Sequence, residues 1–289
     1  MKFVLALAFG DPTHSCELAR TAEEAGWDAI ALSDHVFFPE KLTSPYPYAD
    51  DGVPRFGPDD PFPDPWVAIG AMAAVTTRIR FLTNIYILPL RNPIVVAKTV
   101  GTAALMSNDR VSLGIGMGWM REEFDLLGED FRRRGRRADE MIDVMRKLWT
   151  GGMVEHHGEF FDFDRLQVSP APSQPVPILV GGISEPALRR IGKLGDGWVS
   201  DIHTIDELGA YVEKIGRYRE EYGRADVPLE VVASPSDARG IEDLRRMGDL
   251  GITHMNTMPW HRYGGPTEDL EKKKDGIKRF AEDLIEPLR

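Results

Sequence analysis

The sequence is poor in cysteine, in long hydrophobic runs and in positive charge. Its one cysteine, Cys16, cannot form an internal disulfide, which excludes a disulfide-stabilised scaffold and fits a reducing cytoplasm. No apolar run approaches the roughly 18 residues that a membrane-spanning helix needs. The chain has 35 Lys and Arg against 46 Asp and Glu, a formal net charge of −11. Such a negative field argues against nucleic acid or an anionic membrane surface as the main partner.

The rest of the composition is that of an ordinary globular protein. Hydrophobic residues make up 42% and charged residues 28% of the 289 residues, which excludes disordered and collagen-like chains. The apolar start, 1–10, resembles a signal peptide, but it lacks a small-residue cleavage site and continues into Asp11 and Pro12. We therefore expect a buried strand there and a soluble, cytoplasmic protein. No linker divides the chain, so 1–289 is predicted to be a single domain.

Short apolar runs alternate with longer amphipathic segments along the whole chain. Strands are predicted at 3–9, 28–33, 79–88, 110–116, 178–181, 197–200, 229–233 and 253–257. Helices are predicted at 14–25, 65–76, 93–106, 122–127, 135–150, 185–194, 205–222, 236–250 and 267–285. Strict alternation indicates a parallel sheet with right-handed crossovers. Eight such units predict an α/β fold, a closed (β/α)8 TIM barrel, with an open doubly wound sheet as the alternative.

Two longer excursions interrupt the alternation. The first, 34–64, follows the second strand and is crowded with Pro, Asp and Tyr. The second, 151–177, precedes the fifth strand, carries Phe160, Phe161 and Phe163, and is typical of a hairpin. In a TIM barrel the functional site lies at the C-terminal ends of the strands, so the residues that follow each strand are the candidates for chemistry.

The second strand ends in Asp34 and His35. A histidine beside a carboxylate at a strand end suits proton transfer, because imidazole titrates near neutral pH. The alternative is a loop histidine that is hydrogen-bonded to the backbone. His156 and His157, in the second excursion, are predicted to be solvated. No histidine has metal-ligand spacing, so no metal site is expected.

Glycines and small polar residues follow three other strands. Gly114, Gly116 and Gly118 alternate along one strand and its end, which removes one face of side chains and lets a flat ligand or another backbone approach. The spacing is not that of the dinucleotide-binding fingerprint. Asn84 follows Thr83 in an apolar strand and forms either an interior hydrogen bond or part of a wall for a ligand.

A further glycine pair opens a predicted helix. Gly181, Gly182, Ile183 and Ser184 place free backbone N–H groups and a hydroxyl at a helix start, which predicts a phosphate cradle. The alternative is a plain serine N-cap, because serine is a favoured capping residue.

Several motifs, each weak alone, occur in a specific order. They are 26–35 (GWDAIALSDH), 83–93 (TNIYILPLRNP), 110–118 (RVSLGIGMG), 119–124 (WMREEF), 132–137 (RRRGRR), 177–182 (PILVGG) and 195–198 (GDGW). Together they resemble the bacterial luciferase-like family, and within it the branch that uses the deazaflavin coenzyme F420 in place of FMN. The resemblance covers about 1–200 and, in outline, most of the rest.

The resemblance implies a (β/α)8 barrel, usually a homodimer, that binds a flavin-type ring at the C-terminal mouth. His35 matches the active-site histidine of the family, with Asp34 beside it. The bond between Asn84 and Ile85 matches a non-prolyl cis peptide behind the central ring. Gly181, Gly182, Ile183 and Ser184 match the phosphate-binding segment, and Gly116 and Met117 also belong to the implied cofactor site.

Two positions depart from related proteins. Met117 stands where the FMN-using luciferases carry an arginine that pairs with phosphate, which favours the deazaflavin. Trp119 stands about where F420-dependent sugar-phosphate dehydrogenases carry a glutamate, which argues against that substrate. The anionic tail of the deazaflavin needs local cations in a chain of charge −11, and Arg91 and Arg262 are candidates.

The expected activity is hydride transfer between coenzyme F420 and a small organic substrate. We expect His35 to exchange a proton with the substrate heteroatom, and Asp34 to orient or polarise His35. The aromatic residues of 34–64 either cover an apolar substrate pocket or pack only on one another. One alternative is an FMN-dependent monooxygenase that uses reduced flavin and O2. A second is a barrel that binds a flavin without catalysis.

Overall fold

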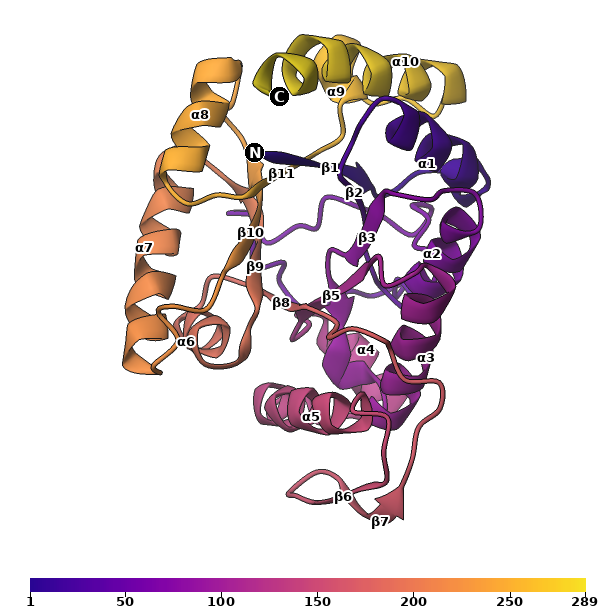
Figure 1. Ribbon diagram of the computed structural model, residues 1–289, viewed down its shortest axis with the longest axis vertical. Coiled ribbons are helices and arrows are strands. Elements are labelled where there is room, and N and C mark those ends of the chain that lie inside the picture. Colours follow the sequence, from indigo (N-terminus) through magenta and orange to yellow (C-terminus); the bar gives the residue numbers. More distant parts are fainter.

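The computed structural model describes residues 1–289, whose main sheet is a closed parallel barrel (Figure 1). Around the barrel the strands are β1 (Lys2–Leu7), β2 (Ala29–Leu32), β3 (Arg80–Thr83), β5 (Val111–Gly116), β8 (Ile178–Gly181), β9 (Gly197–His203), β10 (Glu230–Pro235) and β11 (His254–Thr257). Pairing of β3 with β5 and of β11 with β1 closes the ring. The predicted (β/α)8 barrel is confirmed, and the open sheet is wrong.

Helices surround the barrel on the outside (Figure 1). They are α1 (Ser15–Glu24), α2 (Pro65–Ala73), α3 (Pro93–Met106), α4 (Arg121–Leu127), α5 (Arg134–Leu148), α6 (Glu185–Leu194), α7 (Ile205–Glu221), α8 (Ile241–Asp249), α9 (Trp260–Tyr263) and α10 (Leu270–Phe280). The segment predicted as helix at 236–250 is shorter, since α8 begins at Ile241. The last predicted helix, 267–285, ends as a π-helical turn, Ala281–Ile285. None of these helices combines the length and the apolar character that a membrane span requires.

The core has two layers because side chains alternate between the two faces of each strand. The outer layer lies between the strands and the helices. It contains Phe3 of β1, Trp27 just before β2 and Phe280 of α10, whose rings contact one another edge-on or tilted. The inner layer fills the barrel with small and branched residues: Val4, Ala29, Ala31, Leu82, Leu179, Val199 and Val232. The interior is therefore a packed core, and only its two ends can hold ligands.

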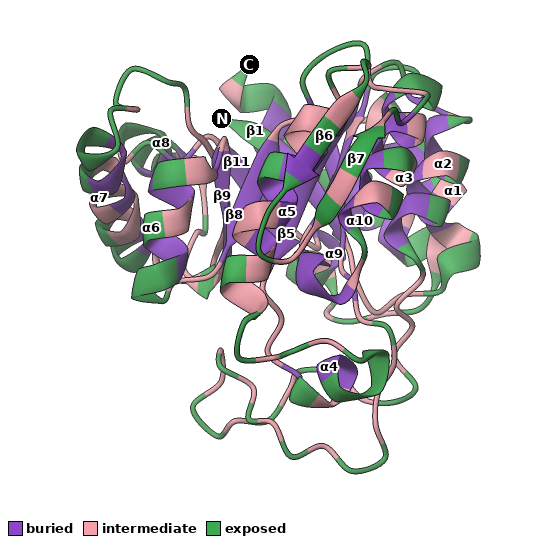
Figure 2. Ribbon diagram, turned by 90° about the horizontal axis from the view of Figure 1, so that it is seen from below, coloured by how far each residue is buried: buried purple, intermediate pink, exposed green.

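The two excursions have different structures. The second forms an antiparallel hairpin of β6 (Val154–His157) and β7 (Asp162–Leu166), as predicted, on the outside of α5. The first has no helix or strand. In Figure 2 it lies with α4 beyond one end of the barrel, as a layer of mostly exposed and half-buried residues below the purple strands.

The strand predicted at 79–88 is interrupted. β3 ends at Thr83, and β4 (Tyr86–Ile87) continues after a cis peptide bond between Asn84 and Ile85, as the resemblance implied. The glycines of β5 face this interruption. A Cβ atom on Gly114 would lie 1.9 Å from the Thr83 carbonyl oxygen, and one on Gly116 would lie 1.9 Å from Ile85 Cδ1. The glycines were expected to let either a flat ligand or another backbone approach. Both make room for the neighbouring chain segment.

Candidate active site

His35 lies just beyond the C-terminal end of β2 and contacts a buried carboxylate. Its Nδ1 is 3.2 Å from Oε2 of Glu123 on α4, and the side chain of Glu123 is fully buried. The other oxygen of Glu123 accepts the N–H of Val36 at 2.7 Å. This contact assigns the ring proton to Nδ1 and leaves Nε2 of His35 without a partner in the chain. Nε2 is thus the atom that can exchange a proton with a ligand.

Asp34 has a different partner from the predicted one. Its carboxylate lies 2.7 Å from Nη1 of Arg91 and accepts the backbone N–H of Ile87 at 2.9 Å. Adjacent residues in extended chain point in opposite directions, so Asp34 turns toward β4 while His35 turns toward α4. Burial raises the pKa of Asp34, and Arg91 opposes the shift. The expectation that Asp34 orients His35 is wrong, because Glu123 has that position.

The two predicted cations are already engaged. Arg91 also donates to the Ile87 carbonyl at 3.0 Å and lies 4.3 Å from the ring centre of Tyr86. Arg262 donates to the carbonyl of Arg239 at 2.7 Å. Arg91 is therefore paired with the carboxylate of Asp34, whereas Arg262 is bonded to a carbonyl and has no carboxylate partner.

Aromatic side chains surround His35, and we call them the aromatic roof: Phe9, Phe38, Tyr46, Phe56, Phe62 and Trp119. The ring centres of Phe56, Phe62 and Trp119 lie 4.9, 5.2 and 5.8 Å from that of His35. The side chain of His35 keeps 10% of its surface exposed. The rings also pack on one another, with Phe56 and Phe62 4.9 Å apart. The rings of the first excursion therefore pack on one another and on His35, and a substrate pocket beneath them stays a prediction.

The glycine pair lies at the end of β8. Gly182 has a left-handed φ of +104°, which favours glycine, and its carbonyl accepts Nε1–H of Trp198 at 3.2 Å. Ser184 is the N-cap residue of α6, but its exposed hydroxyl makes no capping hydrogen bond. The alternative, a serine whose side chain caps the helix by a hydrogen bond, is therefore wrong. Ile183 is half-buried between them.

One cation near the mouth was missed. Arg134, the first residue of α5, donates to the carbonyls of Gly118 (3.1 Å) and Phe131 (2.7 Å). The guanidinium of Arg121 lies 4.8 Å from the centre of the Phe131 ring, and that of Arg134 lies 3.8 Å from the same ring centre. Burial, then Arg121 and Arg190, lowers the pKa of Arg134. The run of arginines at 132–137 was visible in the sequence, but not which of them faces the end of β5.

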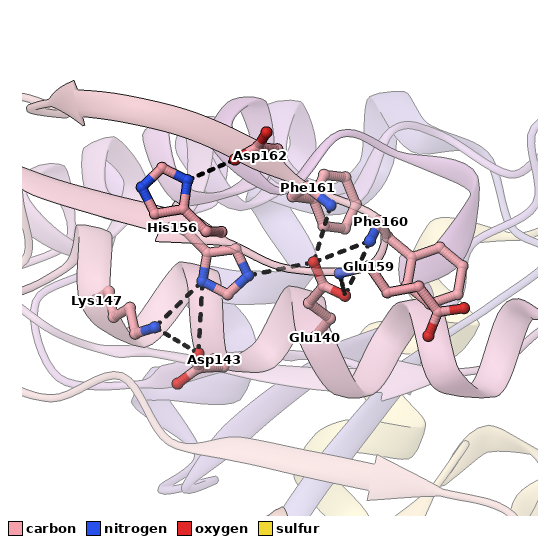
Figure 3. Close-up of polar contacts among 9 residues, drawn as sticks. Glu140, Asp143, Lys147, His156, Glu159, Phe160, Phe161 and Asp162 are labelled. Atoms are coloured by element: carbon pink, nitrogen blue, oxygen red, sulfur yellow. Dashed lines mark hydrogen bonds and ion pairs between the residues drawn. The ribbon is translucent and has the colours of Figure 1, made fainter.

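The second excursion contains a histidine that the sequence analysis placed in solvent. His156 is 7% exposed, and Nε2 lies 3.2 Å from Oε1 of Glu140 (Figure 3). His157 is exposed, as predicted. Period-two alternation in β6 explains the difference, because it turns one of two adjacent residues inward. No group of three or more His, Cys, Asp or Glu side chains is arranged to hold a metal ion.

Comparison with known proteins identifies the family. Residues 6–238 match the luciferase-like monooxygenase family. Rv0940c, an uncharacterized protein of Mycobacterium tuberculosis, is 38% identical over 288 residues, 99% of each chain. This chain therefore belongs to the luciferase-like family of oxidoreductases. A named relative is the F420-dependent glucose-6-phosphate dehydrogenase of Nakamurella multipartita, 29% identical over 253 residues, 83% of this chain and 70% of that protein.

Solved structures share the fold at low sequence identity. An F420-dependent secondary alcohol dehydrogenase in complex with an F420–acetone adduct has a TM-score of 0.74 and 19% identity over 98% of each chain. Monooxygenase RslO1 from Streptomyces bottropensis has a TM-score of 0.76 and 18% identity over 100% of each chain.

Proposed function

We propose that this chain is a coenzyme F420-dependent oxidoreductase that acts on a small organic substrate, with His35 as the proton donor or acceptor. The observation that carries the proposal is the pairing of His35 with fully buried Glu123 at the barrel mouth, which leaves Nε2 free. The F420-dependent relatives support the choice of cofactor. Met117, which stands where the FMN-using luciferases carry an arginine, supports it as well.

The residues at the mouth fit a flat ring with an anionic tail. Ile85 packs against Gly116 and Gly181, where a Cβ would lie 1.9 and 3.1 Å from its Cδ1, and offers an apolar surface. Ser184 has a free hydroxyl at a helix start, and Arg134 adds a half-buried cation. Gly182, Ile183, Ser184 and Arg134 would hold the tail. Asn84, Ile85 and Met117 would face the ring, and Gly116 would contribute by making room for Ile85. When bound, coenzyme F420 supplies two-electron hydride chemistry.

The chain's own contribution is proton transfer and exclusion of water. Nε2 of His35 gives or takes a proton at the substrate heteroatom. The carboxylate of Glu123 stabilises the imidazolium form and fixes the plane of the ring through Nδ1. The aromatic roof removes water from around His35, which strengthens these electrostatic contacts. Trp119 belongs to that roof, so we do not expect a sugar phosphate as the substrate.

One observation favours the alternative of an FMN-dependent monooxygenase. Arg134 binds the Gly118 carbonyl, next to Met117, so the mouth has a cation even without an arginine at that position. A phosphate of either cofactor could pair with it.

Titration with both cofactors tests the proposal. Oxidised F420 and FMN are titrated separately into the purified chain by fluorescence quenching, at one stated salt concentration because both ligands are anionic. We expect F420 to bind at least tenfold more tightly, about 1.4 kcal/mol. Preference for FMN would make monooxygenation the leading function. Tight F420 binding without turnover on alcohols, imines and activated alkenes would favour the non-catalytic barrel.

We also propose that the chain forms a homodimer through α2 and α3. α2 has no charged residue, and exposed apolar side chains lie on the two helices, with Val67, Val95 and Met106 at 73%, 61% and 67% exposure. Helices that are apolar all round are typical of buried surfaces. Sedimentation velocity should show a dimer that Val67→Glu converts to a monomer. A monomeric wild type would contradict the proposal.

A further inference from the structure

The part of the first excursion around Thr43 and Ser44 is attached to α4 by the carboxylate of Glu122. Glu122 accepts hydrogen bonds from the backbone N–H and hydroxyl of Thr43, at 2.7 and 2.6 Å. It also accepts the backbone N–H and hydroxyl of Ser44, at 3.1 and 2.7 Å. Burial raises the pKa of Glu122, but the bonds from Thr43 and Ser44 outweigh it and lower the pKa to about 2. The carboxylate is therefore ionised, and all of its hydrogen bonds to the excursion are charge-assisted.

The same segment is attached to the opposite side of the mouth by a weaker contact. Nη1 of Arg55 lies 3.1 Å from Oδ1 of Asp201 on β9, with 40% and 21% of the two side chains exposed. Nη2 of Arg55 donates to the Tyr48 carbonyl at 2.8 Å. An exposed ion pair contributes little and is screened by salt.

The chain between these attachments crosses the mouth. Tyr46 packs on Trp119 with ring centres 5.1 Å apart. The hydroxyl of Tyr48 lies 3.7 Å from where a Cβ of Gly182 would be, at the end of β8. Phe56 follows directly after Arg55 and contacts His35. The segment therefore reaches from α4 over His35 to the β8–β9 side, across the residues proposed to hold the cofactor.

The two adjacent glutamates of α4 thus have separate tasks. Glu123 holds His35, and Glu122 holds the segment that covers His35. We propose that 43–62 is a lid over the site, that Glu122 is the positioning residue that anchors it, and that the Arg55–Asp201 pair is its releasable end. The inference rests on the proposed function for what enters beneath the lid, but the attachments do not depend on the cofactor.

The first test uses the full chain without cofactor. Hydrogen–deuterium exchange is measured in the wild type, Asp201→Asn and Glu122→Ala, with Glu242→Gln as the matched control because it removes an exposed ion-pair partner on α8. Asp201→Asn should speed exchange at least fivefold at 46–57 and leave Thr43 and Ser44 unchanged. Glu122→Ala should speed exchange at Thr43, Ser44 and 46–57. Exchange equal to that of Glu242→Gln in both variants overturns the proposal.

Quenching by acrylamide reports on the same opening. Trp119 and Trp149 are half-buried, whereas the other tryptophans are buried. The quenching that is lost in a Trp119→Phe background is assigned to Trp119. We expect it to rise in Glu122→Ala, and an unchanged value contradicts the anchor role even if that variant is less stable. Ser44→Ala removes the bond from the Ser44 hydroxyl to Glu122 and the bond that this hydroxyl accepts from the backbone N–H of Arg121. Because the bonds from Thr43 remain, it should give a smaller change in the same direction.

The last test separates this proposal from the proposed function. With F420 bound, Asp201→Asn should raise the dissociation rate at least threefold, and Glu122→Ala should raise KM more than it lowers kcat, with the pH profile of kcat unchanged because Glu123 and His35 remain. A shifted pH profile would mean that Glu122 acts on His35 itself, which overturns the anchor role. If the chain binds no F420, the proposed function fails, whereas the exchange result still decides the lid.

Discussion

Two histidine–glutamate pairs with the same N···O distance occur in very different places. His35 and Glu123 meet at 3.2 Å at the barrel mouth, and His156 and Glu140 meet at 3.2 Å between the hairpin and α5. Both glutamates are on helices, and both histidines are largely buried. Distance and burial alone therefore do not distinguish a reactive histidine from a structural one.

The second nitrogen makes the difference. Nδ1 of His156 lies 3.1 Å from Nζ of Lys147, so both of its ring nitrogens are occupied (Figure 3). Glu140 also accepts the backbone N–H groups of Phe160 and Phe161, at 3.0 and 2.8 Å. His35 keeps Nε2 free and faces the aromatic roof. A histidine whose hydrogen bonds are all satisfied within the chain holds a structure together, whereas one with a free nitrogen beside a site can transfer a proton.

The largest expected effect is a difference in turnover between variants of the two histidines. His35→Ala should lower turnover with F420 by ~10²–10⁴, because the proton donor or acceptor is lost, with cofactor binding largely intact. His156→Ala, as the matched variant, should keep turnover within about threefold of wild type and lower the melting temperature instead. Steady-state kinetics at several pH values check this. Near-normal turnover in His35→Ala would remove its assigned role.

A third buried histidine, with cations instead of a carboxylate beside it, sharpens the comparison. Burial, then Lys2 and Arg80, lowers the pKa of His254 to about 4. The unfolded chain, with a pKa near 6.5, binds more protons between these values. The free energy of unfolding should therefore fall as the pH falls from about 6.5 to 4, by ~3 kcal/mol from this group.

Urea unfolding at pH 7, 5.5 and 4 checks the sign. His254→Gln should flatten the loss of stability over that window. His157→Gln is the control. Because Asp162 raises the pKa of exposed His157, removing this histidine should not flatten the loss of stability at low pH. An unchanged pH slope in His254→Gln would show that His254 is protonated in the folded chain.

The structural pair can be broken from the side of the carboxylate. Glu140→Ala leaves the N–H groups of 159–161 and Nε2 of His156 without their acceptor. We expect about 2 kcal/mol lower stability and faster amide exchange in the hairpin, with cofactor affinity unchanged. Glu213→Ala, which removes one exposed ion pair on α7, is the control and should lie within about 0.5 kcal/mol of wild type. Loss of cofactor affinity in Glu140→Ala alone would mean that the hairpin also supports the mouth.

The smallest expected effect is steric. A Cβ on Gly158 would lie 2.1 Å from Oε1 of Glu140 and 2.5 Å from Nε2 of His156. Gly158→Ala should therefore push the pair apart and lower stability by about 1 kcal/mol. Thermal unfolding measures it, with Gly152→Ala, where a Cβ meets nothing within 4 Å, as the control. Equal melting temperatures would show that the hairpin adjusts freely.

Local patterns in the sequence predicted the barrel but not the contacts of its site. Alternating strands and helices are a property of neighbouring residues, and so the closed barrel and the hairpin were both predictable. His35 was found because it follows a strand. Its partner Glu123 is 88 residues away, and nothing local marks it out from Glu122. Asp34 was assigned to His35 because the two are adjacent, although adjacent residues in extended chain diverge.

Environment decided the other differences. His156 and His157 are adjacent residues of the same type, and only the packing of β6 on α5 makes the first buried and the second exposed. The break in the strand at 79–88 was marked only by the polar pair Thr83 and Asn84 and by the family resemblance, because the apolar residues on both sides favour one continuous strand. Arg134 differs from its neighbouring arginines only in the direction that the first turn of α5 gives it.

The glycines of β5 have a consequence for how such a site can change over time. A Cβ on Gly114 would meet the backbone carbonyl of Thr83, and one on Gly116 would meet the side chain of Ile85. The floor of the mouth therefore has no room for a larger residue at either position while Thr83 and Ile85 stay in place. Four of the six rings of the aromatic roof, those of Phe38, Tyr46, Phe56 and Phe62, are on the first excursion. This segment has no regular structure, so one ring can replace another there without disturbing the barrel. New substrate preferences should therefore arise by substitutions in 34–64, and a laboratory evolution experiment would do best to randomise that segment and leave the floor intact.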